Sequence, residues 1–249
     1  MSRGRVARLK GGRVGRFGWK AQTETREEFV LSAAASEVGL EVPGHHQAGD
    51  PRLPGIGASG LDMDRDECAA LVAFVRELPA PVEHVPADAK EAARIEAGRA
   101  TFGAIGCAAC HLPRLGDVEG IYSDLLLHDM GPKLVDTGSY GVFVASPAGA
   151  GGPNAEGGPR GESAGVLVQD WRTPPLWGLS DSAPYLHDGR AATIGQAIAQ
   201  HGGQGAASAR RYATLPAQRK AQLDAFLQSL SSPPRDDDRP GLAEARRLR

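Results

Sequence analysis

The chain has 249 residues, with 28 Lys and Arg against 30 Asp and Glu and a net charge of −2. This length can bury a core and hold one or two domains, and the near-neutral charge gives no support to nucleic-acid binding. Aromatic residues are few, at 5%, whereas Gly (33) and Pro (18) are many, which indicates helices joined by long loops. No stretch approaches the roughly 20 apolar residues that span a membrane, so the chain is not predicted to be membrane-spanning.

The first part of the chain, residues 1–88, is predicted to consist of a helical segment and a linker. Residues 24–38 carry apolar residues at helical spacing. A clearer helix follows, with Asp62 or Asp64 as its N-terminal cap and Pro79 as the residue that ends it.

A further amphipathic helix is predicted over residues 95–106, ending on Gly106. The basis is a set of apolar or small residues at helical spacing, which are Ile95, Gly98, Phe102 and Ile105.

Residues 107–111 read Cys-Ala-Ala-Cys-His, the signature by which a c-type haem is attached. Cys107 and Cys110 lie one turn apart, so both thiols can bond the two vinyl groups of one porphyrin, and His111 can reach the iron as proximal ligand. A zinc site would need two more Cys or His ligands at metal spacing. The other cysteine, Cys68, falls on an apolar helix face as a small core residue. The sequence therefore predicts one covalently bound haem c.

The C-terminal part of the chain contains a long loop and one more amphipathic helix. Residues 138–166 are rich in Gly, Pro, Ala and Ser, and apolar residues recur at helical spacing between Pro216 and Leu230. In cytochrome c folds the first and last helices cross and pack, and Gly98 on the first would allow a close approach.

The predicted fold class is therefore mainly α. Residues 89–232 are expected to form a cytochrome c-like helical haem domain with long irregular loops, preceded by a partial helical segment over residues 1–88. Residues 233–249 include Arg-Asp-Asp-Asp-Arg and are predicted to be a disordered tail.

Further motifs carry a family resemblance. They read Gly-Arg-Phe-Gly-Trp-Lys-Ala at 15–21, Tyr-Ser-Asp-Leu-Leu-Leu-His-Asp-Met-Gly at 122–131, Arg-Thr-Pro-Pro-Leu-Trp-Gly-Leu at 172–179 and Ala-Pro-Tyr-Leu-His-Asp-Gly-Arg-Ala-Ala-Thr-Ile at 183–194. Together with the haem motif they resemble the bacterial di-haem cytochrome c peroxidase and MauG superfamily. Within it the chain is most similar to the di-haem oxidoreductase, or thiol oxidoreductase, family. The resemblance covers roughly Val14 to Leu230.

Members of this family carry two haems, one in each domain, and the attachment motif here corresponds to the C-terminal haem. The resemblance implies that the chain is a fragment, with a second haem in a missing N-terminal part of which residues 1–88 include a remnant. Its function would be electron transfer to that second haem domain or to a redox partner protein. The alternative is a stand-alone mono-haem electron carrier without catalytic activity.

A low-spin transfer haem needs a sixth iron ligand in addition to His111. The resemblance favours His201, which lies where peroxidase-like members place their distal Met. Met130 is the alternative, because His/Met ligation is common in cytochromes c. His128 and His187 resemble family histidines that organise the pocket through hydrogen bonds and do not bind the iron.

Arg172 and Arg190 are predicted to pair with the haem propionates, because a guanidinium suits carboxylates; a surface salt bridge is the alternative for each. Trp19 matches the inter-haem Trp of the peroxidases, either as an electron relay or as a packing residue. The catalytic Gln of those enzymes falls on Phe29 here, and their Glu falls near Gly39. We therefore expect no catalytic residue in this chain, and whether the full-length protein is a peroxidase-like enzyme stays open.

The expected location is the periplasm, because bacteria attach haem c on that side of the inner membrane. Residues 1–20 are basic and lack the apolar region of a signal peptide. We expect the export signal to belong to the missing N-terminal part.

Overall fold

The computed structural model describes residues 3–47, 57, 59–84, 86–136, 138–139, 142–143 and 166–232. The predicted tail over residues 233–249 and nearly all of the predicted loop over residues 138–166 lie outside the described residues. Within the described part, no helix is long and apolar enough to cross a membrane.

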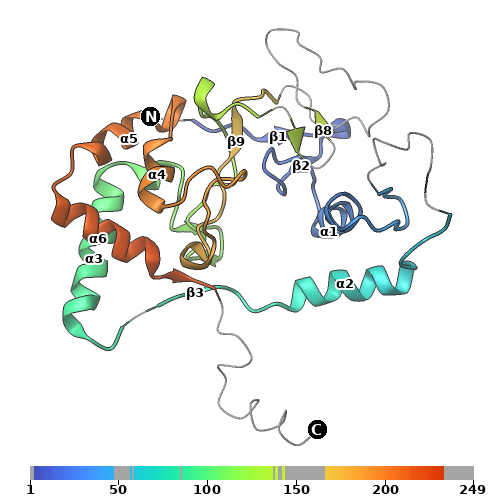
Figure 1. Ribbon diagram of the computed structural model, residues 1–249, viewed down its shortest axis with the longest axis horizontal. Helices are drawn as coiled ribbons and strands as arrows, with labels where there is room; N and C mark the ends of the chain where they lie inside the picture. Colours follow the sequence, from blue (N-terminus) through green and yellow to red (C-terminus); the bar gives the residue numbers. More distant parts are fainter. Residues whose placement is uncertain are drawn as a thin grey trace, which may run out of the picture. The chain divides into compact units, whose positions relative to one another are not determined.

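Figure 1 shows the helices and strands along the chain. The helices are α1 Arg26–Ala33, α2 Arg65–Glu77, α3 Ala89–Ala104, α4 Ile194–Ala199, α5 Ala206–Ala213 and α6 Ala217–Gln228. The strands are β1 Ala7–Arg8, β2 Val14–Gly15, β3 Val82–Glu83, β4 Arg114–Leu115, β5 Val118–Glu119, β6 Leu127–Asp129, β7 Gly138–Ser139, β8 Val142–Phe143, β9 Asp170–Arg172 and β10 Leu230–Ser231.

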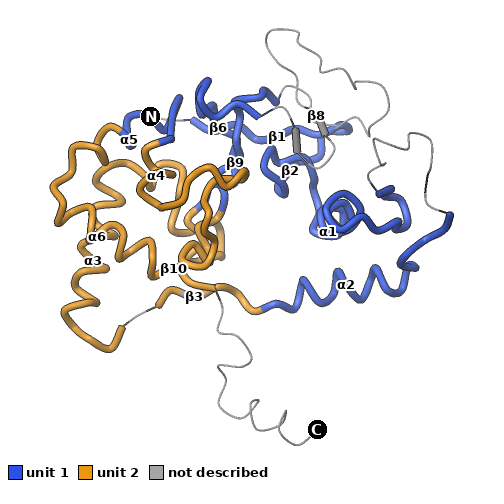
Figure 2. The backbone as a smooth tube through the Cα atoms, viewed as in Figure 1, with its two compact units in different colours: residues 1–78, 123–174, 200–209 blue, residues 79–122, 175–199, 210–249 orange. Residues whose placement is uncertain are grey.

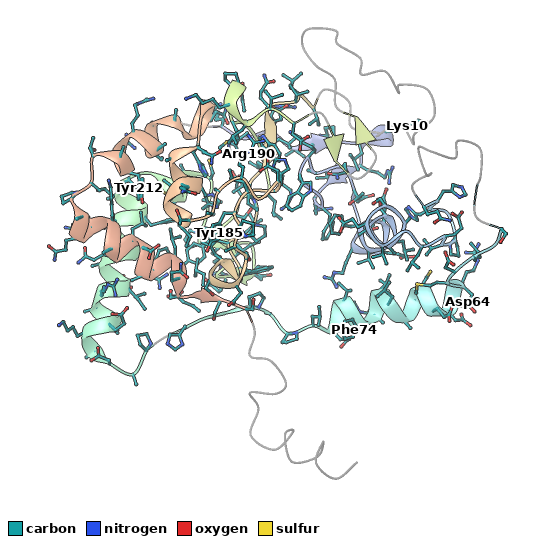
Figure 3. The ribbon with its side chains drawn as sticks, in the orientation of Figure 1. Lys10, Asp64, Phe74, Tyr185, Arg190 and Tyr212 are labelled. Carbon is teal, nitrogen blue, oxygen red and sulfur yellow. The ribbon has the colours of Figure 1, made fainter. Side chains whose placement is uncertain are left out.

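Helices α1 and α2 occur where the sequence predicts them. Asp64 caps α2 with a complete capping box, in which its carboxylate accepts hydrogen bonds from the Asp66 and Glu67 amides. Asp62, the other predicted cap, instead accepts a hydrogen bond from the Glu41 amide at 2.7 Å. Helix α1 continues into a π-helical turn over Ala34–Val38 that the pattern does not predict. In Figure 3, Asp64 marks the start of α2.

The described chain divides into two compact units, shown in Figure 2. Unit 1 comprises residues 1–78, 123–174 and 200–209, and unit 2 comprises residues 79–122, 175–199 and 210–249. The predicted boundary after residue 88 stays a prediction.

Unit 1 combines helices α1 and α2 with short strands and loops, and contains two small hydrophobic clusters. Strand β6 pairs antiparallel with β9, with Leu127 opposite Arg172, and Arg5 bridges to Leu127. Leu127 is fully buried and packs with Ala7, Ala21 and Val166. The second cluster contains Leu31, Ala34, Val42 and Cys68, so Cys68 is the small core residue that the sequence predicts.

Lys20 is almost fully buried in unit 1, at 1% exposure. Its ammonium group donates hydrogen bonds to the Val168 and Asp170 carbonyl oxygens at 2.8 and 2.7 Å and lies 3.8 Å from the Trp171 ring centroid. Burial lowers the pKa of Lys20 from 10.5 to about 8, although the charges of Asp136 and Asp170 oppose this shift.

This burial predicts a rise in stability at alkaline pH. Below about pH 8, Lys20 is charged in both states, and the desolvation cost is fully present. Between about pH 8 and 10.5, only the unfolded chain keeps the proton, so the free energy of unfolding increases with pH. Between pH 7 and 10, the free energy of unfolding measured with urea should therefore increase for the wild type relative to Lys20→Met. Parallel pH profiles for the two proteins would contradict this expectation.

Unit 2 is organised by helices α3 and α6, which pack against each other as the sequence predicts. A side chain at Gly98 would place its Cβ 2.0 Å from the Gln222 carbonyl oxygen and 2.7 Å from Phe226 Cβ, so only glycine allows this approach. Phe226 is fully buried and Phe102 nearly so, and their rings meet edge to face at 5.4 Å. Strand β3 pairs with β10, which joins the segment before α3 to the segment after α6.

The predicted mainly α fold class is correct only in part, because the structure combines its helices with small sheets. It did not include the small two-stranded sheets, of which five occur in the described residues.

Candidate functional site

The Cys-x-x-Cys-His motif lies in unit 2, in one tight turn directly after α3. Gly106 ends the helix with a φ of 93°, a left-handed conformation that glycine adopts without strain. Cys107–Ala109 then form a 3-10 turn in which the Cys110 and His111 amides donate to the Cys107 carbonyl oxygen at 3.3 and 3.0 Å. This turn gathers two thiols and an imidazole within five residues.

The His111 ring is oriented by a hydrogen bond from its Nδ1 to the Tyr122 carbonyl oxygen at 2.9 Å. A carbonyl oxygen only accepts, so the proton is on Nδ1 and the lone pair is on Nε2. Metal-binding histidines are held in this way, with one ring nitrogen donating to a carbonyl and the other facing the metal. The residues present therefore fit a haem iron bound by His111.

The state of Cys107 also fits haem attachment better than dithiol chemistry. Cys107 packs against the core cluster of unit 2, and burial raises the pKa of its thiol to about 12; the neighbouring Cys110 acts in the same direction. A redox-active Cys-x-x-Cys pair needs the opposite, a thiol with a lowered pKa. Neither cysteine is part of a disulfide.

The two candidate sixth ligands lie side by side in unit 1. His201 follows α4 by two residues and is half-buried, and Met130 follows β6. A Cβ on Gly205 would lie 3.0 Å from His201 Cβ and 3.3 Å from Met130 Cε, so the two side chains flank the same glycine. The attachment motif belongs to unit 2, and pairing of His111 with His201 or Met130 stays a prediction.

His128 is buried between two hydrogen-bonding partners of unit 1. Its Nδ1 lies 2.7 Å from Gln204 Oε1 and its Nε2 lies 2.9 Å from Asp124 Oδ2. Burial opposes ionisation of Asp124, yet hydrogen bonds from His128 and the Leu126 amide lower the pKa of this carboxyl below its ordinary value. These contacts agree with the hydrogen-bonding role predicted for His128.

The two candidate propionate partners already contact other groups. Arg172 donates from Nε to the Gly18 carbonyl oxygen at 2.8 Å, and burial lowers the pKa of Arg172 to about 10. Arg190, labelled in Figure 3, forms an ion pair with Asp188. The contact with Arg190 lowers the pKa of the Asp188 carboxyl. Pairing of either arginine with a propionate stays a prediction.

Sequence reasoning missed three residues that join the motif to the rest of unit 2. The carbonyl of Tyr122 orients His111, and the Tyr122 hydroxyl contacts Arg99, which pairs with Glu83. Tyr122 opens a family motif, but its contact with the attachment turn has no sequence signal. Glu83 and Arg99 belong to different elements and follow no common spacing.

A family model and a solved structure are similar to the chain. The model described as "Di-haem oxidoreductase, putative peroxidase" matches residues 153–230. The crystal structure of a MauG-like protein associated with microbial copper homeostasis has a TM-score of 0.44 and 20% sequence identity, covering 92% of this chain and 77% of that one. No curated protein matches the chain. The family predicted from the motifs thus agrees with the family model that matches residues 153–230, about a third of the chain.

Proposed function

We propose that the chain binds one haem c covalently and transfers electrons as the C-terminal half of a di-haem oxidoreductase. Cys107 and Cys110 would form the thioether bonds, and His111 would bind the iron. The observation that carries the proposal is the hydrogen bond from His111 Nδ1 to the Tyr122 carbonyl oxygen at 2.9 Å. His111 directly follows Cys110, the second of the two attachment cysteines. The proposal also includes a second haem, in another part of the oxidoreductase, and a redox partner protein.

When bound, the haem supplies an iron centre that accepts and releases one electron. The chain's own residues would orient this centre through His111 and place apolar side chains beside it. Phe102, nearly fully buried, lies 6.3 Å from the His111 ring, centroid to centroid, and packs edge to face on Tyr122. Such an apolar surrounding is one of the means by which a protein sets a haem potential.

The proposal is tested by exporting the chain with an added signal peptide in a host that has haem-maturation proteins. We expect one covalent haem per chain in the periplasmic fraction, measured by haem staining of a denaturing gel and by the pyridine haemochrome. The same chain without the signal peptide should carry none. An exported, folded chain without covalent haem would refute the proposed function.

For the sixth ligand we propose His201, with Met130 as the alternative. Ferric His201→Ala should lose its low-spin absorption and electron paramagnetic resonance signals and become high-spin, because the iron is left with five ligands. His84→Ala is the control, since the His84 side chain is exposed. If His201→Ala instead stays low-spin and the double variant with Met130→Leu becomes high-spin, that result would assign the sixth ligand to Met130.

A further inference from the structure

Tyr122 has an unusual backbone conformation at the point where it meets His111. Its φ is 47°, in the left-handed region that bulky residues seldom occupy. The carbonyl oxygen of the same residue accepts the His111 hydrogen bond. Such a conformation persists only when surrounding contacts hold it, and its position beside the attachment motif points to a role for those contacts.

The Tyr122 side chain is held from two sides. Its ring is 4% exposed and packs edge to face against Phe102 at 6.0 Å and Phe226 at 5.5 Å. The ring packing fixes the side chain within the core, and the hydroxyl reaches the edge of that core, where it contacts the Arg99 guanidinium.

Arg99 links this hydroxyl to a strand that precedes α3. One terminal nitrogen contacts the Tyr122 hydroxyl, the other pairs with the Glu83 carboxylate, and Nε donates to Glu96 at 3.0 Å. The guanidinium carbon lies 4.7 Å from the Phe226 ring centroid. A planar guanidinium can make these contacts at once, whereas an ammonium group is a single point charge.

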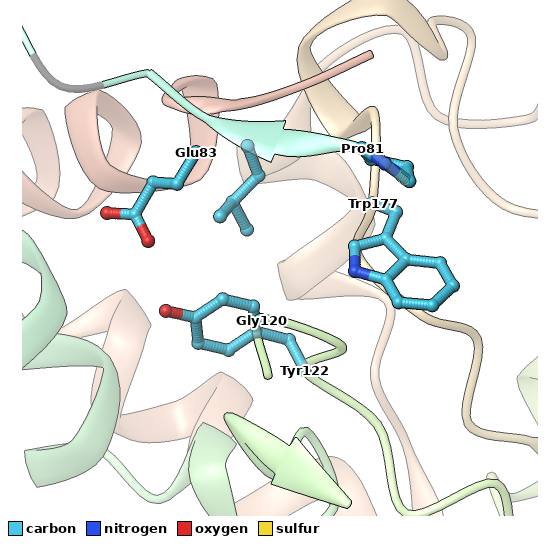
Figure 4. Close-up of a pocket in the computed structure, with 6 residues that line it drawn as sticks. Pro81, Glu83, Gly120, Tyr122 and Trp177 are labelled. Atoms are coloured by element: carbon cyan, nitrogen blue, oxygen red, sulfur yellow. The ribbon is translucent and has the colours of Figure 1, made fainter. Parts of the chain in front are cut away.

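Glu83 is in turn fixed by strand pairing, because it lies opposite Leu230 in the β3–β10 pair. Glu83 and Tyr122 line a small pocket together with Pro81, Gly120, Trp177 and Leu230. Figure 4 shows the Glu83 carboxylate and the Tyr122 hydroxyl on the same side of this pocket, away from Trp177. The β3–β10 pair thereby connects through two side chains to the residue that orients His111.

We propose that Glu83 and Arg99 are positioning residues that hold the Tyr122 carbonyl on His111 Nδ1 and thereby set the electron donation of the imidazole to the haem iron. The inference rests on the proposed function. A stronger Nδ1 hydrogen bond makes Nε2 a better donor, which stabilises ferric iron and lowers the reduction potential. Loosening Tyr122 should therefore weaken this bond and raise the potential.

The first test uses Tyr122→Phe in the haem-loaded chain, because it removes the hydroxyl and keeps the ring packing and the charge. We expect the His111 Nδ1 proton of the ferric protein to exchange with deuterium about tenfold faster by NMR, and the reduction potential to rise. Tyr212→Phe is the matched control, since Tyr212 belongs to the same unit and contacts Lys220 instead. Neither quantity should change in the control.

The second test compares two arginines of α3 that each bond a glutamate three residues earlier. Arg94 pairs with Glu91 and donates to the Ala221 carbonyl oxygen at 3.2 Å, so it also contacts α6. Arg99→Gln should accelerate Nδ1 proton exchange about as much as Tyr122→Phe, whereas Arg94→Gln should not. Arg99→Lys keeps the charge and should fail to restore slow exchange, because its ammonium group does not bridge two partners in the same way.

The outcomes separate the two proposals. A haem-loaded chain in which Tyr122→Phe and Arg99→Gln match their controls would overturn the positioning role and leave the proposed function intact. A folded, exported wild-type chain without haem would overturn both. If Arg99→Gln does not fold, the result for Tyr122→Phe decides alone.

Discussion

Replacing Cys107 and Cys110 together by alanine is expected to abolish covalent haem attachment completely. In the proposed site each thiol would form one thioether bond to the porphyrin, so the double substitution would leave no covalent link. In the structure both thiols lie in one short turn, and neither forms a disulfide. Haem staining of a denaturing gel and the pyridine haemochrome measure the loss, and each single substitution should leave one thioether bond.

Cys68→Ala provides the matched control for this loss. Cys68 is the remaining cysteine of the chain, is 5% exposed, and packs in the apolar cluster with Leu31, Ala34 and Val42. Its replacement should cost some stability in unit 1 and leave haem attachment at the wild-type level. Covalent haem that persists in the double variant, or that disappears in Cys68→Ala, would contradict the assignment of the attachment site.

Gly98→Ala is expected to destabilise the packing of α3 against α6 strongly. The new Cβ would lie 2.0 Å from the Gln222 carbonyl oxygen, a backbone atom that moves only if α6 moves. We expect a loss of about 3 kcal/mol in the free energy of unfolding, because overpacking of a close contact forces the two helices apart. Urea unfolding of the haem-loaded chain, followed by circular dichroism, measures this loss.

Gly103→Ala is the control on the same helix. No atom lies within 4 Å of a Cβ built at Gly103, and the position is exposed. There alanine should be neutral or should stabilise the helix by up to about 1 kcal/mol, since glycine is the poorer helix former. Equal stability of the two variants would show that the α3–α6 approach does not depend on Gly98.

The elements predicted correctly from the sequence have local causes. The cap of α2 follows from Asp64 and Glu67, which form a capping box within four residues. Helix α3 follows from its apolar period, and its end follows from Gly106. The close approach of α3 and α6 could be predicted because a glycine stands within the apolar stripe of a helix that precedes a haem motif.

The features that the sequence did not reveal depend on partners far along the chain. Strands β6 and β9 pair across some forty residues, with three residues in each strand and no alternating pattern to mark them. The contacts of Arg99 with Glu83 and Tyr122 likewise join helix α3, strand β3 and a loop that are separate along the chain. Lys20 belongs to a family motif, but its burial against backbone carbonyls depends on the Val168–Asp170 segment.

The candidate site could likewise be predicted where its cause is local, and not where it depends on the fold. The spacing of the motif identifies Cys107, Cys110 and His111 without any tertiary information. The acceptor that fixes the tautomer of His111 is a backbone carbonyl, which carries no residue-type signal, and so the role of Tyr122 required coordinates.

The pairing of α3 with α6 bears on the order of events during biosynthesis. In the folded chain, burial raises the pKa of the Cys107 thiol from 9.0 to about 12, and Cys107 packs against the core cluster that includes Leu223 and Phe226 of α6. Helix α6 is synthesised after Cys107, so the thiol remains solvated and reactive until α6 has been made. Haem ligation is therefore expected to act on the open chain, with the bound porphyrin then serving as the template on which the two helices close.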